Sequence, residues 1–346
     1  MSKGFFMNDY GEGAHPLVMQ RLMETNLEHT CGYGMDDYSL RAQALIREKC
    51  GQPQAQVHMM AGGTSANVVA LSAFMRPYEA VIAAAGGHIN VHETGAVEAS
   101  GHKVLVAASK DGKVLPEGVR AVCAAHPDEH MVHPRVLYIS QSTEVGTVYT
   151  MDELRALRAV CDECGLILYV DGARLGSALV ACGMTLAELA SVADCFYIGG
   201  TKNGLLFGEA LLIQNDALKP CFRHMIKQCG GMLAKGRLFG VQFSAWLEND
   251  LWLRAAGHAN EMAERLTAGI ADKDYDFLAH SPTNQLFPIF PDELVDALAR
   301  DFAFEYQAVL GDGRTAIRLV TSWATKPEAV EAFLAALPAQ EERRPL

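Results

Sequence analysis

Two apolar runs that each lead to a charged residue constrain this chain more than any other feature. Residues 166–170 are apolar without alternation, as in a strand buried on both faces of a parallel sheet, and the run stops at Asp171. A second apolar run, residues 195–198, leads to Lys202. Open α/β sheets bind ligands at the carboxyl ends of their strands, so we expect both residues at one sheet edge, joined by a crossover helix near residues 179–191.

Such a pair suits the cofactor pyridoxal 5′-phosphate (PLP). A lysine can bind the aldehyde carbon of PLP, and a carboxylate can keep the pyridinium nitrogen protonated so that the ring accepts electrons. A buried ion pair between Asp171 and Lys202 that closes the sheet would account for the same residues equally well. The two residues alone therefore leave both interpretations open.

The length of the chain predicts a large α/β domain with a smaller second domain, and its net charge limits the possible partners. The chain has 346 residues, more than one average domain, and 50% of them are apolar, which is enough for a substantial core. The expected division is an arm at residues 1–14, a large domain at 15–245 and a small domain at 246–346. A long helix from residue 242 to about residue 269 is expected to lead into the small domain. A net charge of −12 without a basic block argues against nucleic acid and anionic membranes as partners.

The cysteines and the N-terminal residues indicate a cytoplasmic location. Nine cysteines are an odd number and are scattered rather than spaced as a disulfide framework, which favours a reducing compartment. Residues 1–10 lack the apolar core of a secretory signal, and no run approaches the length of a membrane span.

Two groups of potential metal ligands are better explained without a metal. The pair Cys161 and Cys164 lies in an expected helix at residues 151–164 and has no second pair, so a helix face turned partly inward is favoured over zinc or redox chemistry. Three histidines lie in a polar stretch whose prolines disfavour a long helix, which favours a solvated loop. They are His126, His130 and His133.

A glycine-rich turn predicts an anion site. Residues 57–60 read as a short strand that opens onto Gly62-Gly63-Thr64, with a helix expected to follow. The first turn of a helix offers unpaired backbone N–H groups and a positive dipole end, which suits a phosphate. The turn matches neither a Walker loop nor G-x-G-x-x-G, and an ordinary helix cap would also explain it.

The motifs together resemble a known family. Asp171-Gly172-Ala173-Arg174 followed by Thr201-Lys202 resembles the D-G-A-R and S/T-K-G signature of the threonine aldolase and β-eliminating lyase family of fold-type I PLP-dependent enzymes. The likeness extends from about Met7 to Trp323. It implies a mostly parallel central sheet in the large domain and a smaller C-terminal α+β domain, in a protein similar to low-specificity L-threonine aldolases.

The resemblance implies which residues hold PLP. Lys202 would carry the cofactor, and Asp171 would contact its ring nitrogen. The family's S-G-T-x-x-N phosphate loop assigns Gly63, Thr64 and Asn67 to the phosphate.

Two further segments would complete the cofactor site. His88-Ile89 resembles the start of the family pattern H-I-x-x-E, with the glutamate, Glu93, one position later; His88 would stack on the pyridine face, with Glu93 as its partner. The family's G-G-G-M-R-Q segment carries an arginine that reaches a neighbouring subunit's phosphate. Here that position is Leu233, and either Lys235 or Arg237 would take over the role, unless this is a solvent-facing turn. The active site would then lie between the subunits of a homodimer or homotetramer.

The family pattern also assigns the substrate contacts. Arg318 matches the small-domain arginine that grips the substrate carboxylate, a task that suits a bidentate guanidinium, and Arg174 would assist in binding the carboxylate and the cofactor. Asn8 stands where the family has a serine, and Tyr33 belongs to the segment that matches Y-G-E-D. A surface loop for Asn8 and a surface ion pair for Arg318 are the alternatives.

Glu144 is the main departure from the family pattern. Threonine aldolases of the family read E-N-T-H-N where this chain reads Gln141-Ser142-Thr143-Glu144-Val145, so a glutamate replaces the histidine that touches the β-hydroxyl. A carboxylate can accept that proton as a general base, but it lacks the neutral hydrogen-bonding pattern of imidazole. The side-chain preference and the reaction type therefore stay open.

Three functions follow from these residues. The first is aldol cleavage of a β-hydroxy-α-amino acid of the L-threonine or allo-threonine type to glycine and an aldehyde. The catalytic set would be Lys202, Asp171, His88 and Glu144, without a metal. The second is a β-eliminating lyase or another PLP enzyme acting on a β-substituted amino acid, and the third is a PLP-binding regulator without turnover.

Overall fold

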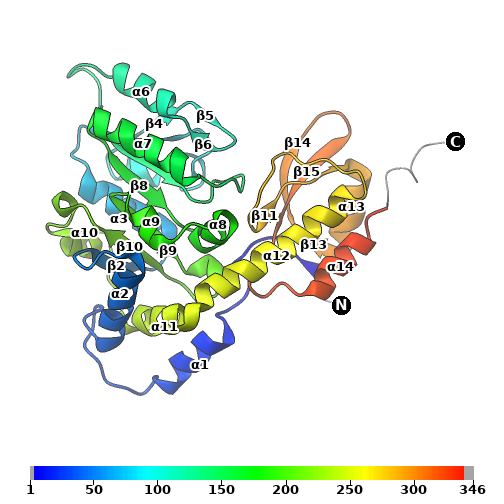
Figure 1. The fold of residues 1–346 in the computed structure, drawn as a ribbon, viewed down its shortest axis with the longest axis horizontal. Coiled ribbons are helices and arrows are strands. Elements are labelled where there is room, and N and C mark those ends of the chain that lie inside the picture. Colours follow the sequence, from blue (N-terminus) through cyan, green and yellow to red (C-terminus); the bar gives the residue numbers. More distant parts are fainter. Residues whose placement is uncertain (1–3, 339–346) are drawn as a thin grey trace.

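The protein consists of two domains joined by one long helix (Figure 1). The computed structural model describes residues 4–338, so residues 1–3 of the expected arm and residues 339–346 of the expected small domain lie outside the description. No helix within the described residues is both long and apolar enough to cross a membrane.

The large domain is built on a seven-stranded, mostly parallel sheet, which confirms the expected class. Only β10 runs antiparallel to its two neighbours. The strands in spatial order are β2 (Gln56–Met60), β10 (Glu209–Ile213), β9 (Cys195–Gly199), β8 (Ile167–Asp171), β7 (His133–Ser140), β3 (Glu79–Ala84) and β4 (Lys103–Ala107).

Helices cover both faces of this sheet, so the central strands are apolar on both sides. One face packs against α1 (Pro16–Glu24), α2 (Asp37–Cys50), α6 (Pro116–Ala124), α7 (Met151–Cys164), α8 (Leu175–Cys182), α9 (Leu186–Ala190) and α11 (Arg237–Leu247). The other packs against α3 (Gly63–Phe74), α4 (His88–Val91), α5 (Ala96–Ala99) and α10 (Phe222–Gln228). Strand alternation places three tyrosines on this second face, namely Tyr138, Tyr169 and Tyr197.

The expected single crossover helix at residues 179–191 is wrong, because two helices occupy this segment. The first, α8, ends at Gly183, whose φ of +68° belongs to the left-handed region that favours glycine. Thr185 then starts α9 by accepting a hydrogen bond from the Glu188 N–H, as a helix N-cap does. The crossover still leads from β8 to β9.

The expected continuous helix over residues 242–269 is also interrupted. The helix is interrupted at Asp250, where φ is +52°, and α12 (Leu251–Ala271) begins after this residue. The start of α12 packs in the large-domain core through Trp252, and from Met262 onward it packs in the small-domain core. This helix therefore carries the chain from one core to the other, and the expected boundary at residue 245 stays a prediction.

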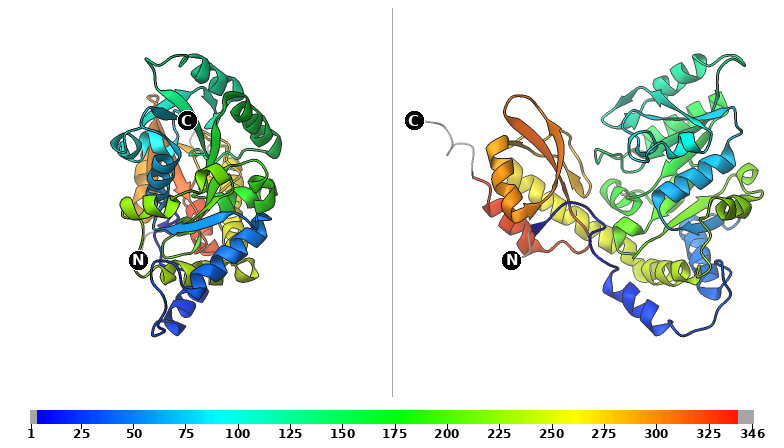
Figure 2. Two further views of the ribbon diagram at one scale, coloured as in Figure 1. Left: turned by 90° about the vertical axis from the view of Figure 1, so that its left-hand side faces the viewer. Right: turned by 180° about the vertical axis from the view of Figure 1, so that it is seen from behind.

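The small domain is an antiparallel sheet backed by helices. Its strands are β11 (Gln285–Leu286), β12 (Ile289–Pro291), β14 (Glu305–Val309) and β15 (Arg314–Val320), and its helices are α13 (Asp292–Asp301), α14 (Pro327–Ala335) and the second half of α12. The N-terminal arm joins this domain, because β1 (Gly4–Phe5) pairs in parallel with β13 (Phe302–Ala303) and Phe6 is buried in the core (Figure 2). A separate hairpin in the large domain consists of β5 (Ser109–Lys110) and β6 (Lys113–Val114).

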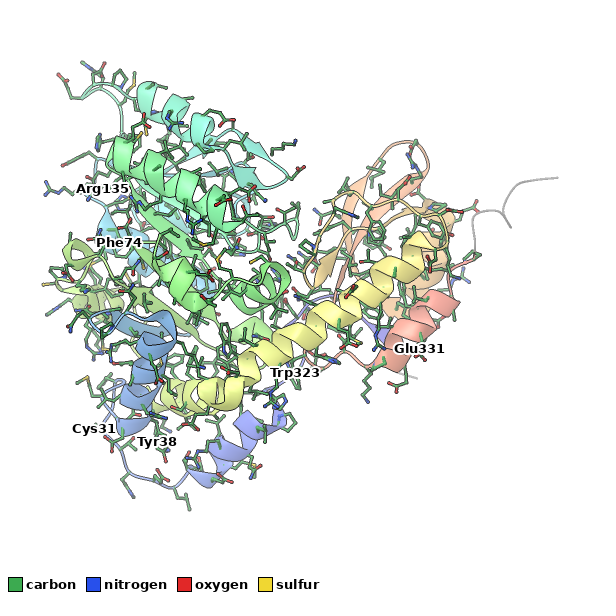
Figure 3. The ribbon with its side chains drawn as sticks, viewed as in Figure 1. Cys31, Tyr38, Phe74, Arg135, Trp323 and Glu331 are labelled. Atoms are coloured by element: carbon green, nitrogen blue, oxygen red, sulfur yellow. The ribbon has the colours of Figure 1, made fainter. Side chains whose placement is uncertain are left out.

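The arm then crosses to the large domain near the domain junction. Trp323, which lies beside α12 in Figure 3, contacts the ring of His15 at a centroid distance of 5.3 Å. Residues 8–10 therefore pass between the two domains, next to the carboxyl edge of the large sheet.

Candidate active site

A cavity of about 320 Å³ lies at the carboxyl edge of the large sheet, where the strand-end pattern places the site. It brings together these predicted residues: Gly63, Thr64, His88, Glu144, Asp171, Arg174 and Lys202. Its wall also contains Tyr10, Tyr197 and Glu209, for which the sequence pattern predicts no role.

Asp171 is held by a ring of donors at the end of β8. Its Oδ2 accepts a hydrogen bond from the Tyr138 hydroxyl at 2.6 Å, and its Oδ1 accepts one from the Tyr197 hydroxyl at 2.5 Å. The Ala173 N–H donates to Oδ1 at 3.0 Å. Burial, followed by the charge of Asp171, raises the pKa of both tyrosines well above its usual range, so they remain donors. The carboxyl group is therefore oriented before any ligand binds.

Gly172 is required by the close approach of two strands. A Cβ at this position would overlap the carbonyl oxygen of Tyr197 on the neighbouring strand β9. The glycine of the Asp-Gly-Ala-Arg motif thus lets the chain turn tightly after Asp171 while the two strand ends stay in contact.

Asn67 supports Asp171 and is not one of the residues that line the cavity, and its contact with phosphate stays a prediction. Its Oδ1 accepts a hydrogen bond from the Tyr169 hydroxyl at 2.9 Å, which fixes the orientation of the amide. Its Nδ2 then donates to Asp171 Oδ2 at 3.2 Å and to Glu93 Oε1 at 2.7 Å. The residue is completely buried on α3, one turn away from the helix start. These hydrogen bonds link Asn67 to Asp171 and Glu93.

The start of α3 is nevertheless open to the cavity. Gly62 precedes the helix in an extended conformation and has no side chain to cap the first turn, while the Ser65 hydroxyl accepts a hydrogen bond from the Gly62 N–H at 3.3 Å. A Cβ on Gly63 would lie 3.0 Å from the Tyr197 hydroxyl, so a glycine allows this close approach. The backbone N–H groups of Gly63 and Thr64 are the ones that the first turn of a helix leaves available to an anion.

His88 lies at the cavity wall among carboxylates. Its Nδ1 contacts Glu93 Oε1 at 2.8 Å, although Glu93 lies five residues after His88, one position later than the glutamate of H-I-x-x-E. Burial alone would lower the pKa of His88, but the hydrogen bond with Glu93 and the charges of Glu144 and Asp171 outweigh burial and raise it. The imidazole therefore retains its proton to a higher pH than a free histidine.

Lys202 sits in a short 3₁₀ turn (Thr201–Asn203) directly after β9. A hydrogen bond from α11 fixes this turn, because the Trp246 indole N–H donates to the Asn203 carbonyl at 2.7 Å. Burial, followed by the charge of Arg174, lowers the pKa of Lys202. A larger fraction of this lysine is therefore the neutral, nucleophilic amine.

Arg174 is anchored by Asp9, which the sequence pattern does not single out. Arg174 Nε donates to Asp9 Oδ2 at 2.7 Å, and Nη2 donates to Oδ1 at 3.2 Å. Asn284 of the small domain also donates to Asp9 Oδ2, at 2.9 Å. Burial opposes ionisation of Asp9, yet the charges of Arg174 and Lys202 lower its pKa. This ion pair thus ties the arm, the large domain and the small domain together at the cavity.

The predicted arm residue, Asn8, lies outside the cavity wall. Its side chain accepts a hydrogen bond from the Tyr10 N–H at 3.1 Å in an exposed turn, while Asp9 and Tyr10 approach the site instead. The match of Asn8 with the family serine was the available signal, and a contact of Asn8 with the substrate stays a prediction.

Glu144 extends into the cavity from the loop after β7. The Ser140 hydroxyl donates to its Oε1 at 3.2 Å. Its charge raises the pKa of His88, so the two side chains are electrostatically coupled.

The remaining predicted residues do not line this cavity. Arg318 Nη2 pairs with Glu305 Oε2 at 2.5 Å on the face of β15 opposite the small-domain core. Arg237 Nη2 donates to the Thr25 carbonyl at 2.8 Å, and the Tyr33 ring lies 4.9 Å from Lys227 Nζ. Lys235 is exposed between α10 and α11. Their contacts with ligand or with a second subunit stay predictions.

The potential metal ligands are dispersed. His126 bonds to the Val122 carbonyl after α6, and His133 begins β7. Within residues 4–338 no group of three histidine, cysteine, aspartate or glutamate side chains is arranged to hold a metal ion.

A buried lysine and a tyrosine-bound aspartate at one edge of this sheet are the arrangement expected of a PLP-dependent enzyme. The chain matches the family model described as "Beta-eliminating lyase" over residues 12–292, and it belongs to this family. The family is PLP-dependent.

Individual relatives are similar to this chain over nearly its whole length. The chain is 35% identical to a low specificity L-threonine aldolase of Pseudomonas sp. (strain NCIMB 10558), over 95% of this chain and 96% of the relative. A similar relative from Pseudomonas aeruginosa is also 35% identical, over 94% of each chain.

Solved structures of PLP-dependent enzymes share the fold of this chain. A threonine aldolase structure from Leishmania major superposes with a TM-score of 0.94 at 44% identity, covering 96% of this chain and 97% of that one. A Thermus thermophilus aspartate aminotransferase, at 15% identity and a TM-score of 0.67 over 97% and 91% of the two chains, shares the fold. The expected fold-type I architecture is thereby confirmed.

Proposed function

We propose that this chain is a PLP-dependent aldolase that cleaves a β-hydroxy-α-amino acid of the L-threonine or allo-threonine type to glycine and an aldehyde. The observation that carries the proposal is that Lys202, Asp171 and Arg174 share one cavity at the sheet edge. The names of the relatives from Pseudomonas and Leishmania support the same reaction.

The residues of the cavity fit PLP. Lys202, with its lowered pKa, would bind the aldehyde carbon, and Asp171 would face the ring nitrogen. Gly63 and Thr64 would bind the phosphate at the start of α3. When bound, PLP supplies a ring that accepts the electron pair released from the broken bond at Cα.

Arg174 would orient the substrate. Asp9 engages Nε and Nη2, so the guanidinium is held rigidly while Nη1 is left to donate to the substrate carboxylate. Arg318 would add a second contact from the small domain once its pairing with Glu305 opens. Holding the carboxylate determines which bond at Cα stands perpendicular to the ring.

Glu144 would then act as the general base. It accepts the proton of the β-hydroxyl, the Cα–Cβ bond breaks, and the former β-carbon leaves as an aldehyde. The protonated His88, next to Glu144 and Glu93, balances the negative charge in this part of the cavity. The remaining fragment is released as glycine after Cα regains a proton.

One observation favours a second reaction. A carboxylate at position 144 can assist the loss of a Cα proton and a β-substituent as readily as it accepts a hydroxyl proton. Ammonia and a keto acid would then be the final products.

Product analysis separates these reactions. The purified protein is incubated with PLP and L-threonine, and glycine, acetaldehyde, ammonia and 2-oxobutanoate are quantified beside a Lys202→Ala control. Equal amounts of glycine and acetaldehyde, absent in the control, support aldol cleavage. Ammonia and 2-oxobutanoate support elimination, and PLP binding without any product from β-substituted amino acids supports a regulator.

A second copy of the chain completes the proposal. Apolar side chains are exposed on α1 and the segment after it, with Met23 at 73% and Leu27 at 88% exposure. Such a patch is typical of a subunit interface, and Lys235 or Arg237 nearby would reach the partner's phosphate. Light scattering that gives the mass of a dimer or tetramer supports this arrangement, and a monomer contradicts it.

A cytoplasmic location also belongs to the proposal. Its support is that all nine cysteines are free thiols, as in a reducing compartment.

A further inference from the structure

Glu209 is a buried carboxyl group in the cavity wall that the proposed reaction does not use. It opens strand β10, is 4% exposed, and lines the same cavity as Lys202 and the start of α3. A glutamate at the start of an apolar run gives no signal in the sequence, because charged residues commonly begin strands at the surface. Its burial at an anion site therefore requires a physical explanation.

The register of the sheet places this carboxyl between two functional segments. Glu209 pairs with Met60 of β2 on one side and with Gly199 of β9 on the other. Met60 leads into the turn at Gly62, and Gly199 leads into the turn that carries Lys202. The side chain lies on the sheet face that α3 covers, since Met60 belongs to the core cluster of that face.

The carboxyl group is held in one orientation. The Gly200 N–H donates to Glu209 Oε2 at 3.2 Å, and the Thr201 hydroxyl also approaches this carboxyl. Thr201 is itself fixed, because its Oγ1 accepts a hydrogen bond from the Gly208 N–H at 3.0 Å. Glu209 is thus held by the turn that carries Lys202, and it forms part of the cavity wall.

An ionised carboxylate at this position would conflict with the anion site. A phosphate at the start of α3 carries about two negative charges at neutral pH, and a second anion in the same cavity would repel it. Burial raises the pKa of Glu209 to about 8, although the hydrogen bond from Thr201 and the charge of Lys202 oppose this rise. The charge of Asp171 contributes to this rise, and the other titratable groups that face Glu209 are Tyr197 and Tyr169. The group is therefore a neutral acid at neutral pH, and a neutral acid is a hydrogen-bond donor.

We propose that Glu209, in its carboxylic acid form, donates a hydrogen bond to the phosphate group of the ligand bound at the start of α3. This role rests on the proposed function, because it takes PLP as the phosphate ligand. Affinity for the phosphate is then greatest above about pH 6, where the phosphate becomes a dianion, and falls once Glu209 loses its proton. The enzyme would release its cofactor more readily in alkaline conditions.

The test uses a ligand that cannot react with Lys202. The aldehyde-free analogue 4-deoxypyridoxine 5′-phosphate is titrated into apo-protein over about pH 6 to pH 10, for the wild type and for Glu209→Gln. Glutamine keeps an N–H donor but does not titrate. We expect the wild-type dissociation constant to rise by up to about tenfold per pH unit above the pKa of Glu209, because one proton is linked to binding. The variant should show no such rise.

Two controls make the result specific. Unphosphorylated 4-deoxypyridoxine should bind with the same pH dependence in both proteins, because it lacks the acceptor. Glu79→Gln replaces another buried carboxylate, at the start of β3, and should keep the wild-type profile. The same alkaline rise in the wild type and in Glu209→Gln would overturn the proposal.

A second measurement covers the case in which Glu209→Gln does not fold. Infrared difference spectra of the wild-type apo-protein should show the carbonyl band of a protonated carboxyl that disappears near pH 8 and is retained to higher pH when the analogue is bound. No such band, or a band that the analogue leaves unchanged, would refute the donor role. If the analogue binds but shows no dependence on Glu209, only this inference fails, whereas a wild type that binds neither the analogue nor PLP contradicts the proposed function as well.

Discussion

Asp9→Asn should weaken both folding and substrate binding through one ion pair. The wild-type carboxylate accepts two hydrogen bonds from Arg174 and one from Asn284, and its side chain is completely buried. Asparagine has nearly the same shape but carries no charge and has only one acceptor oxygen. The guanidinium of Arg174 would stay buried without its counter-charge.

The expected cost follows from the burial of the pair. Removing one partner of a buried ion pair typically costs about 3–5 kcal/mol, and the remaining amide oxygen places Asp9→Asn near the lower value, about 3 kcal/mol. The pKa of Asp9 is lowered in the folded protein, so its contribution is complete above the unfolded value of 3.8 and is lost as the pH falls through the folded value. The difference in unfolding free energy between wild type and variant should therefore be present at pH 7 and shrink in acid.

The assay combines denaturant unfolding with steady-state kinetics. A loosely held Arg174 misplaces the substrate carboxylate, and a misplacement of about 1 Å can cost about a hundredfold in rate, so kcat/KM should fall by at least about tenfold. Asp194→Asn is the matched control, because Asp194 also pairs with an arginine. Its distance to Arg158 is 2.6 Å, and this pair does not line the cavity. It should lose stability and keep kcat/KM. Equal kinetic losses in both variants, or an unchanged kcat/KM in Asp9→Asn, would refute the reasoning.

Three further changes test other parts of the site. Glu144→Gln should lower kcat by about a hundredfold or more, as expected for loss of a general base, without changing the melting temperature; an unaltered kcat excludes this role. Tyr197→Phe removes one hydrogen-bond donor to Asp171 and should cost about 1–3 kcal/mol in unfolding free energy. A red- or blue-shifted absorption band of bound PLP would report the altered environment of the aspartate. An unchanged spectrum argues against this link. Gly172→Ala forces a Cβ against the Tyr197 carbonyl and should destabilise the protein by about 1–3 kcal/mol or prevent folding; a variant as stable as the wild type contradicts the packing argument.

The fold and the central pair could be predicted from local patterns. An apolar run that ends in a polar residue identifies both a buried parallel strand and its carboxyl end, so Asp171 and Lys202 were placed at the same sheet edge. The glycine-rich turn at Gly63 was found for the same reason, because a strand, a turn and a helix leave a clear trace in sequence.

Residues that act through tertiary contacts could not be predicted in this way. Asp9 is an ordinary loop residue until the arm lies against Arg174, and Glu209 acquires its altered pKa only through burial. Asn67 was assigned by its place in a motif, whereas its amide orientation depends on Tyr169, more than a hundred positions away along the chain. Spacing predicts which element carries a residue, but not which partner its side chain finds.

Helix interruptions were missed for a related reason. The breaks at Gly183 and Asp250 depend on backbone conformations with positive φ, which the spacing of apolar residues does not reveal. Glycine is frequent inside predicted helices, and an aspartate with positive φ is uncommon, so neither residue was a sufficient stop signal.

The most direct test of the account is to identify the residue that holds PLP. The protein is incubated with PLP, reduced with borohydride and digested, and the modified peptide is identified by mass spectrometry, with Lys202→Ala as the control. We predict a single modification at Lys202, and its loss when an excess of L-threonine is added before reduction. Modification at another lysine such as Lys235, or none at all, would contradict the assignment of this cavity as the active site.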